Sequence, residues 1–309
     1  MKKIFAAIAA FGLAATVAFA QDYNAAVDAF NAGATALESN KTEALAQFRS
    51  ALAQAQALEG EEAAELVAKC KDAIPGVLMS IAKEKINEGA YDEALASLAE
   101  TQTVAAEYGV ATVADEATAL VPNVYLRKGS TLLKDKDFTG AAEALGKVVE
   151  LTPEDGQAFL LLGQAQMQNG NLPAATEALE KAAAFGKADQ ANKLLSNAYL
   201  KQGQALLKGG KNAEAIAALE KANSYGENAN AYKLIASAYT KSGKSKDAIN
   251  AYKKYLEVSP NAKDADDIIF TIAATAQKAG DKATATEYYK KLAGTKYAAQ
   301  AEAQLKTLK

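Results

Sequence analysis

The chain has 309 residues and a formal net charge of −3, from 34 Lys and Arg against 37 Asp and Glu. It contains no His and a single Cys, Cys70, which excludes His-based catalytic triads, zinc sites made of several Cys and any intramolecular disulfide. The mildly acidic balance, with only Arg49 and Arg127 as arginines, argues against nucleic acid as the main partner.

Residues 1–20 have the pattern of a secretory signal peptide. Lys2 and Lys3 precede an apolar run over 4–17, and small residues surround a cleavage point after Ala20. The apolar run is short for a transmembrane anchor, which is the alternative reading. We therefore expect cleavage after Ala20, a periplasmic protein and no membrane span in what remains.

The rest of the chain predicts helix pairs in chain order. Apolar residues recur at three- and four-residue spacing, and Gly or Pro punctuates the segments. The predicted pairs cover about 23–58, 61–108, 121–153 and 229–261, and a last amphipathic helix covers 298–308. The fourth pair contains the matching residues from Phe159 to Ala182, the fifth begins near Asp189, and the seventh contains the matching residues from Ile269 to Leu292. The small residues that open the second helices are Ala44, Ala94, Ala141, Ala175, Ala215, Ala248 and Ala285.

Some pairs carry more specific expectations. Pro75 and Pro122 lie inside long first helices, and a proline there is expected to kink or break the helix. In the first pair the turn is about one residue short. The fifth pair matches the third and the sixth in different registers, which predicts a first helix of about 20 residues, from near Asp189 to Lys208.

The sixth pair, 229–261, shows the pattern most fully. Asn228 and Ser245 are expected to cap its two helices, and Gly243 is expected to end the first in a left-handed conformation. Its large and small residues resemble the tetratricopeptide repeat (TPR) motif at seven of eight places. These are Tyr232, Ile235, Ala236, Tyr239, Ala248, Tyr252 and Pro260. Tyr255 stands where the family usually has a small residue, so we expect looser or reshaped packing at that helix crossing.

The resemblance implies an all-α, right-handed solenoid of about seven TPR-like antiparallel helix pairs with a C-terminal capping helix. On this reading, residues 21–121 form divergent TPR-like pairs, 122–296 form TPR repeats and 297–309 form the cap. Terminal elements of such stacks cover faces that have no neighbour.

Chemistry-bearing motifs are missing from the sequence. Gly209 and Gly210 belong to a helix-pair turn, and Asp266 and Asp267 lie where a helix start favours negative charge. We expect no catalytic residues, no metal and no cofactor, and hence a protein that is not an enzyme.

The resemblance also implies where a partner binds, because the first helices of TPR pairs line a groove. Carried over to this sequence, the groove positions form a stripe of amides and lysines with no acid before Asp267. The candidate partner-binding residues are Gln164, Gln168, Lys193, Asn197, Lys201, Asn230, Lys233, Ser237, Lys241 and Lys278. Some TPR proteins hold a peptide carboxylate with Lys and Asn at the places of Lys193 and Asn197, and Lys233 with Ser237 is a partial copy.

These observations predict a non-catalytic interaction scaffold of the cell envelope that binds an extended, acidic or amide-rich segment of another exported protein. The plain alternative for the stripe is a solvated, Lys-rich helix face. Two other functions stay open at this point. One is a structural self-association module, which a monomer in solution would exclude, and the other is a binder of a cell-wall glycan or small ligand.

Overall fold

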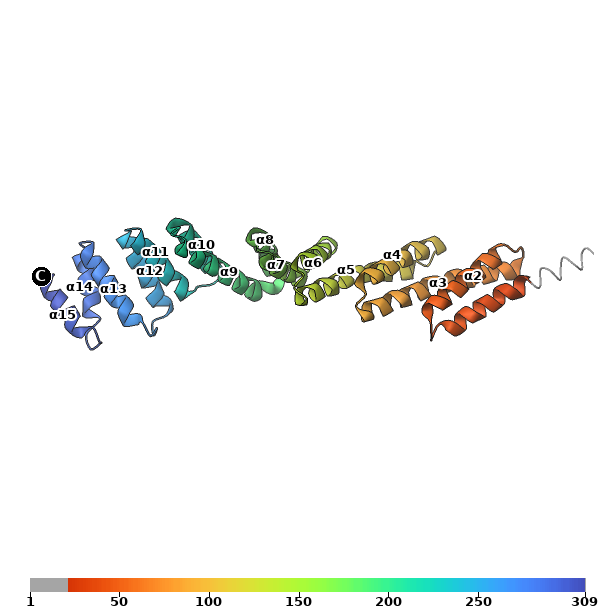
Figure 1. Cartoon of the computed structure of the whole chain (residues 1–309), viewed down its shortest axis with the longest axis horizontal. Helices are drawn as coiled ribbons and strands as arrows, with labels where there is room; N and C mark the ends of the chain where they lie inside the picture. Colours follow the sequence, from red (N-terminus) through yellow and green to blue (C-terminus); the bar gives the residue numbers. More distant parts are fainter. Residues whose placement is uncertain (1–21, 309) are drawn as a thin grey trace, which may run out of the picture. The chain divides into compact units, whose positions relative to one another are not determined.

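The computed structural model describes residues 22–308, and all regular structure in that range is helical (Figure 1). The contacts divide the chain into two compact units, and the boundary between them in the sequence lies between Pro153 and Glu154. We call them unit 1 and unit 2 and describe each by itself. The expected signal peptide, 1–20, lies outside the described residues.

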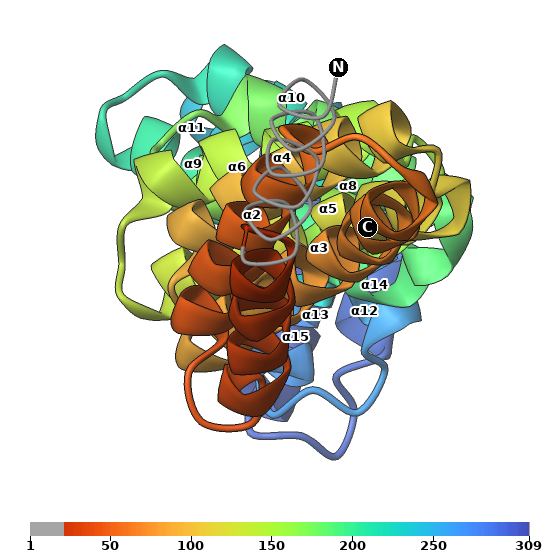
Figure 2. The ribbon, with the colours of Figure 1, turned by 90° about the vertical axis from the view of Figure 1, so that its right-hand side faces the viewer.

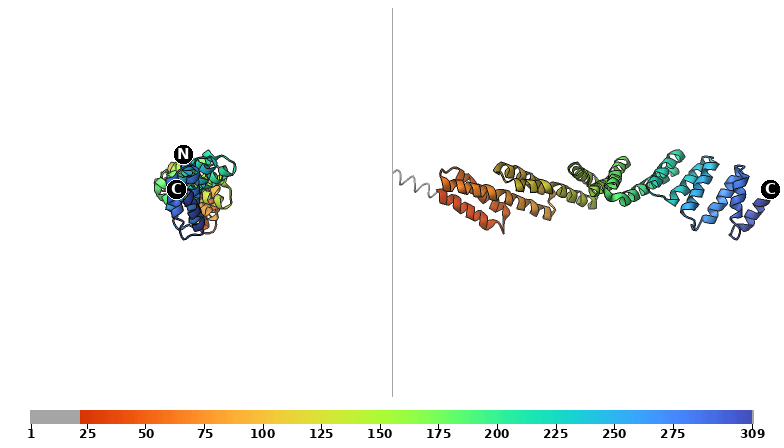
Figure 3. Two further views of the ribbon diagram at one scale, coloured as in Figure 1. Left: turned by 90° about the vertical axis from the view of Figure 1, so that its left-hand side faces the viewer. Right: turned by 180° about the vertical axis from the view of Figure 1, so that it is seen from behind.

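Unit 1 consists of antiparallel helix pairs that follow one another in chain order. Residues 22–36 are helical. The helices that follow are α2 (Lys41–Gln56), α3 (Glu61–Glu88), α4 (Tyr91–Tyr108), α5 (Ala111–Lys134) and α6 (Phe138–Leu151). Each of these packs against its neighbours in the sequence, as can be followed from both sides in Figures 1 and 3.

Unit 2 repeats this arrangement with helices that are mostly shorter, apart from α9. They are α7 (Gly156–Gln168), α8 (Leu172–Ala182), η1 (Ala183–Lys187), α9 (Ala188–Lys208), α10 (Asn212–Tyr225), α11 (Ala229–Lys241), α12 (Ser245–Val258), α13 (Ala265–Lys278), α14 (Lys282–Lys290) and α15 (Ala298–Thr307). The expectation of a long α9 is confirmed, since it has 21 residues. Helices and loops make up the whole described ribbon (Figure 2), so the all-α solenoid of helix pairs is confirmed.

A small residue on each first helix faces a large residue 16 positions later on the second helix. Three of these small residues are glycines, and a Cβ built on Gly129, Gly163 or Gly203 would lie only 2.5–2.6 Å from the Cγ of the partner leucine. The pairs are Ala82–Leu98, Gly129–Leu145, Gly163–Leu179, Gly203–Leu219, Ala236–Tyr252 and Ala273–Tyr289. This constant spacing lets the backbones of each pair approach closely, with the large side chain filling the crossing.

The first pair departs from this spacing. Gly33 faces Phe48, whose ring carbons lie 3.1 Å from a Cβ built on the glycine. The separation is one residue shorter than in the later pairs, as expected from its short turn.

From the second pair onward, the turn inside each pair contains one residue with positive φ. Glycine supplies it at Gly89, Gly170, Gly210, Gly243 and Gly280, with φ between 72° and 80°. In the third pair Lys136 takes this place with φ 64°, and among the described residues it is the one non-glycine with positive φ. The chain therefore keeps the turn geometry even where the sequence lacks the residue that adopts it most easily.

Three expectations need correction. Of the expected kink or break at Pro75 and Pro122, the break is wrong, since α3 and α5 each run through the proline without interruption. Packing of these long helices against both sequence neighbours compensates for the missing hydrogen bond. The N-cap of α12 is Lys244, and Ser245 is already helical.

The division expected between residues 121 and 122 separates weak from strong matches to the repeat pattern and lies inside α5. The division into two units by contacts lies between Pro153 and Glu154.

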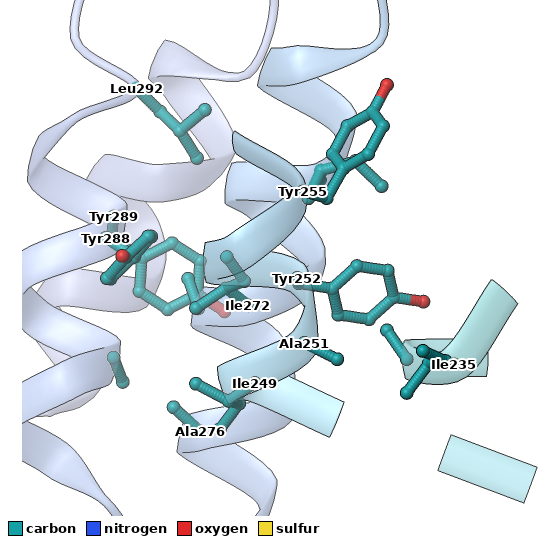
Figure 4. Close-up of a cluster of buried hydrophobic side chains, with 14 of the residues drawn as sticks. Ile235, Ile249, Ala251, Tyr252, Tyr255, Ile272, Ala276, Tyr288, Tyr289 and Leu292 are labelled. Carbon is teal, nitrogen blue, oxygen red and sulfur yellow. The ribbon is translucent and has the colours of Figure 1, made fainter. Parts of the chain in front are cut away.

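The core of unit 2 contains the residue that departs from the repeat pattern. Tyr255 and Tyr252 are both buried on α12, with Tyr252 directed towards Ile235 of α11 (Figure 4). At the C-terminal end, Ala301 of α15 is buried in the same cluster. Tyr255 is thus a buried member of this core, with an exposed fraction of 7%.

Cys70 is a core residue of unit 1. It is 0% exposed, and burial raises the pKa of its thiol to about 11. The thiol behaves as a small apolar side chain, as its position within an apolar helix face indicates.

Candidate functional site

A surface hollow in unit 2 gathers polar side chains from three segments. Its volume is about 380 Å³, and it lies between the first half of α9, the end of α10 and the loop before α11. The lining residues are Asp189, Asn192, Lys193, Ser196, Asn197, Tyr225, Gly226, Glu227 and Asn228. We call this hollow the α9 hollow.

Two of the predicted partner-binding residues lie together in the α9 hollow. Lys193 and Asn197 are one helical turn apart on α9, and both are exposed. Neither side chain has a hydrogen bond or ion pair with any residue between 22 and 308, and the same holds for Asn192. One cation and two amides are therefore available to a ligand.

The loop wall of the hollow is held by its own hydrogen bonds. The side chain of Asn228 accepts from the amide of Asn230 at 2.9 Å and so caps α11. The backbone amide of Asn228 donates to Asn223 Oδ1 at 3.1 Å. The ring of Tyr199 on α9 stacks on that of Tyr225 at the end of α10, with centroids 5.9 Å apart. This contact holds the end of α10 against α9.

The charge of the hollow differs from the expectation. Asp189 and Glu227 lie in its wall with Lys193, so the hollow contains two carboxylates, although neither is one of the stripe positions. Glu227 belongs to the loop after α10, and only the packing of that loop beside α9 brings it to the groove. The hollow contains one cation and two carboxylates. This balance disfavours an acidic ligand and favours a ligand that binds through hydrogen bonds to the amide side chains.

Lys233, another predicted partner-binding residue, is engaged within the chain. Its ammonium donates to one carboxylate oxygen of Asp264, and the hydroxyl of Tyr255 donates to the other. The ammonium also lies 5.7 Å from the centroid of the Tyr255 ring. A carboxylate of this chain thus occupies the position in which a partner's carboxylate was expected.

The electrostatics of this trio follow from these contacts. The hydrogen bond from Lys233, followed by that from Tyr255, lowers the pKa of Asp264. Burial first, and the bond to Asp264 second, raises the pKa of Tyr255 to about 12. Asp264 therefore stays ionised and Tyr255 stays protonated across the neutral range.

The other predicted residues lie outside the hollow. Gln168, Lys201, Asn230, Lys241 and Lys278 are exposed, whereas Gln164 and Ser237 are half-buried. Leu160, one helical turn before Gln164, is 4% exposed and belongs to the core.

Sequence reasoning missed Asp189, Asn192 and Ser196 of the hollow. They lie four, one and three residues from Lys193, so the three- and four-residue spacing of a helix face could have found them. No signal in the sequence pointed to Glu227, since it is 34 residues from Lys193 and belongs to a loop.

Unit 1 has two adjoining hollows of about 480 Å³ and 320 Å³. Lys128 lines both, and its ammonium is paired with Asp92, which lines both as well. The ammonium of Lys128 already has a partner, whereas Lys193 has no hydrogen bond or ion pair with residues 22–308. We therefore take the α9 hollow as the candidate binding site.

Within residues 22–308 there is no group of three or more His, Cys, Asp or Glu side chains arranged to hold a metal ion. In the same range, no helix combines the length and the hydrophobicity that crossing a bilayer requires.

Comparison with known proteins identifies the repeat. The sequence model of the tetratricopeptide repeat family matches residues 126–192 and 200–266. No curated protein sequence matches the chain.

Solved structures are similar over part of the chain. A crystal structure of MamA is 26% identical, covers 57% of this chain and 91% of its own, and superposes with a TM-score of 0.33. The pilF protein of Pseudomonas aeruginosa is 19% identical over 56% of this chain and 75% of its own, with a TM-score of 0.28. YrrB, described as a TPR protein with an unusual peptide-binding site, is 17% identical over 61% of this chain and 88% of its own, with a TM-score of 0.31. Since these TM-scores are low, the assignment of tetratricopeptide repeats to this chain rests on the family match and on the repeated helix-pair geometry.

Proposed function

Because this chain is a tetratricopeptide-repeat protein, a class that mediates protein–protein interaction, we propose that it is a non-catalytic scaffold of the cell envelope that holds an extended segment of an exported partner in the α9 hollow. The leader-like residues 1–20 support export and a periplasmic location. Sequence chemistry supports the absence of catalysis, since the chain has no His and only one Cys.

The observation that carries the proposal is the unpaired set of polar side chains on α9. Lys193 and Asn197 project one turn apart into a hollow of about 380 Å³ and have no partner among residues 22–308. An amide side chain offers both a donor and an acceptor, so Asn192 and Asn197 can pair with the backbone of an extended segment. Lys193 then adds one charge-assisted bond to a carbonyl or side-chain oxygen.

The same geometry supports one class of segment. Asp189 and Glu227 in the wall repel a strongly acidic peptide, and the cation of Lys233 is occupied by Asp264. The segment proposed as the ligand is therefore rich in Asn, Gln and backbone amides, with at most one acidic group.

The test is site-specific crosslinking in the native host. A photoreactive residue in place of Asn197 is expected to capture one defined partner, identified by mass spectrometry. Adding Lys193→Glu should reduce that capture about tenfold or more, because it replaces the free cation of the hollow by a third carboxylate.

Lys208→Glu is the matched control. Lys208 is exposed on the same helix and outside the hollow, so the substitution makes the same change in net charge and should leave capture unchanged. Equal losses from both variants would indicate a general charge effect and would overturn the hollow as the binding site.

Export is tested separately. The protein recovered from the periplasmic fraction should begin at Gln21 by intact mass. A chain that retains Met1 and stays in the cytoplasm would contradict this part of the proposal.

A further inference from the structure

The two units carry opposite net charge. Residues 22–153 contain 11 Lys and Arg against 21 Asp and Glu, a net charge of −10. Residues 154–309 contain 21 Lys against 16 Asp and Glu, a net charge of +5. The small net charge of the whole chain conceals this asymmetry, and charge asymmetry between halves indicates an electrostatic interaction surface.

The positive charge of unit 2 is concentrated in the turns inside its helix pairs. The segments 208–214, 241–247 and 278–284 contain seven lysines and three acids, a net charge of +4. The lysines are Lys208, Lys211, Lys241, Lys244, Lys246, Lys278 and Lys282. We call this set the lysine edge.

The lysine edge lies along one side of unit 2. In a row of antiparallel helices successive turns alternate between two edges, so the turns of α9–α10, α11–α12 and α13–α14 share one edge. The loops 226–228 and 259–264 lie along the other edge, as can be followed in Figure 1. One pair after another therefore presents its lysines in the same direction.

These lysines are available for an external partner. All seven are exposed. Lys211 pairs with Glu214 at 3.4 Å, and the Lys244 ammonium lies 5.9 Å from the centroid of the Tyr239 ring. The other five have no hydrogen bond, ion pair or ring contact with residues 22–308. Of the acids in these turns, Asp281 is used to cap α14.

Unit 1 offers the complementary charge. Six of its cations are already in ion pairs within the unit: Lys41, Arg49, Lys83, Lys85, Lys128 and Lys147. Glu59, Glu61, Glu62 and Glu65, around the start of α3, are all exposed and have no ion pair with residues 22–308. Glu59 lies in the loop before α3, and the other three lie in the first two turns of α3. We call these four residues the acidic loop.

We propose that the lysine edge of one copy of this chain docks on the acidic surface of unit 1, centred on the acidic loop, of a second copy. The partner is another copy because the chain itself carries both halves of the complementary pair. The contact is head-to-tail, so it leaves one lysine edge and one acidic loop free for further copies. Exposed ammonium groups on flexible stems make such a contact sensitive to salt.

The experiment measures molecular mass by sedimentation velocity over a range of protein concentrations at two ionic strengths. At about 0.01 M salt, where charges act over about 30 Å, the mass should rise with concentration. At about 1 M salt, where the range is about 3 Å, the protein should be monomeric. A monomer at both ionic strengths up to the highest concentration would overturn the proposal.

Charge reversal assigns the surfaces. A triple variant, Lys208→Glu with Lys246→Glu and Lys282→Glu, changes one lysine in each turn and touches no residue of the α9 hollow. A second triple variant, Glu59→Lys with Glu62→Lys and Glu65→Lys, reverses the acidic loop. Each should lose association at least tenfold at low salt, with circular dichroism confirming the fold of both.

Mixing the two variants provides the decisive result. The lysine-edge variant keeps a native acidic loop and the acidic-loop variant keeps a native lysine edge, so the mixture should recover association. Failure of the mixture to associate, although both variants are folded, would contradict docking through these surfaces.

Two further outcomes separate this inference from its competitors. Cosedimentation of monomeric protein with phosphatidylglycerol vesicles, lost in the lysine-edge variant, would replace the second copy by a lipid surface and overturn the proposal. Partner capture through residue 197 should be unchanged in the lysine-edge variant, so the self-association and the proposed groove function can fail independently.

Discussion

The ammonium group of Lys233 on α11 is paired with the carboxylate of Asp264, which lies 31 residues further along the chain, just before α13. This bond ties two consecutive first helices of unit 2 together. It also removes a lysine that the repeat pattern assigned to partner binding. The carboxylate is shared with the hydroxyl of Tyr255, the residue that departs from the repeat pattern.

We predict that Asp264→Asn lowers the free energy of unfolding by about 1 kcal/mol, because it weakens two charge-assisted hydrogen bonds at a partly exposed site. Urea denaturation followed by circular dichroism measures this. Asp266→Asn is the control, since Asp266 is of the same type two residues away and has no hydrogen bond or ion pair with residues 22–308. If the two variants lose the same stability, the trio has no special role.

The raised pKa of Tyr255, about 12, predicts a stability change at alkaline pH. In the unfolded chain a tyrosine ionises near pH 10. The contribution of Tyr255 is therefore complete below about pH 10 and is lost as the pH rises through about 12. In urea titrations between pH 9 and 12, Tyr255→Phe should lose less stability than the native protein over this window. Parallel curves for the two proteins would refute the prediction.

In the third pair, alanine substitutions at two glycines, one on α5 and one on α6, are predicted to change stability in opposite directions. A Cβ on Gly129 would lie 2.6 Å from Leu145 Cγ, so Gly129→Ala should destabilise unit 1 by about 1–3 kcal/mol through overpacking. A Cβ on Gly146, in the interior of α6, would meet nothing within 4 Å. Gly146→Ala should therefore stabilise by about 0.5–1 kcal/mol. Thermal denaturation distinguishes the signs, and destabilisation by both would argue against the crossing model.

The turn at Lys136 carries strain that glycine would relieve. Its φ is 64°, whereas the equivalent place in the fourth pair is Gly170 with φ 75°. Lys136→Gly should raise the free energy of unfolding by about 1 kcal/mol, and Gly170→Lys should lower it by a similar amount. A Cβ on Gly170 would meet nothing within 4 Å, so the second effect is conformational rather than steric. A loss of stability in Lys136→Gly would show that the side chain contributes more than the strain costs.

Much of the fold could be predicted from the sequence because its signals are local. The 21-residue helix α9 was expected from two competing alignments of the same segment, and Asn228 was expected as the cap of α11. A helix break at Pro75 and Pro122 was expected because the hydrogen bond that a proline removes is a local loss that the sequence shows. The packing against neighbouring helices that compensates for this loss is not visible in the local sequence. Ser245 was misplaced by one residue, which is within the usual uncertainty of helix ends.

The candidate site was less predictable. Lys193 and Asn197 share a helix face with four-residue spacing, so the sequence alone determined that they lie together. The same spacing and the same turn signals determined the succession of helix pairs and the placement of lysines in the turns of unit 2. Only the tertiary structure decided which lysines are free. The packing of loops from 30 or more residues away brings Glu227 beside Lys193 and Asp264 against Lys233, and no local pattern encodes contacts over that separation.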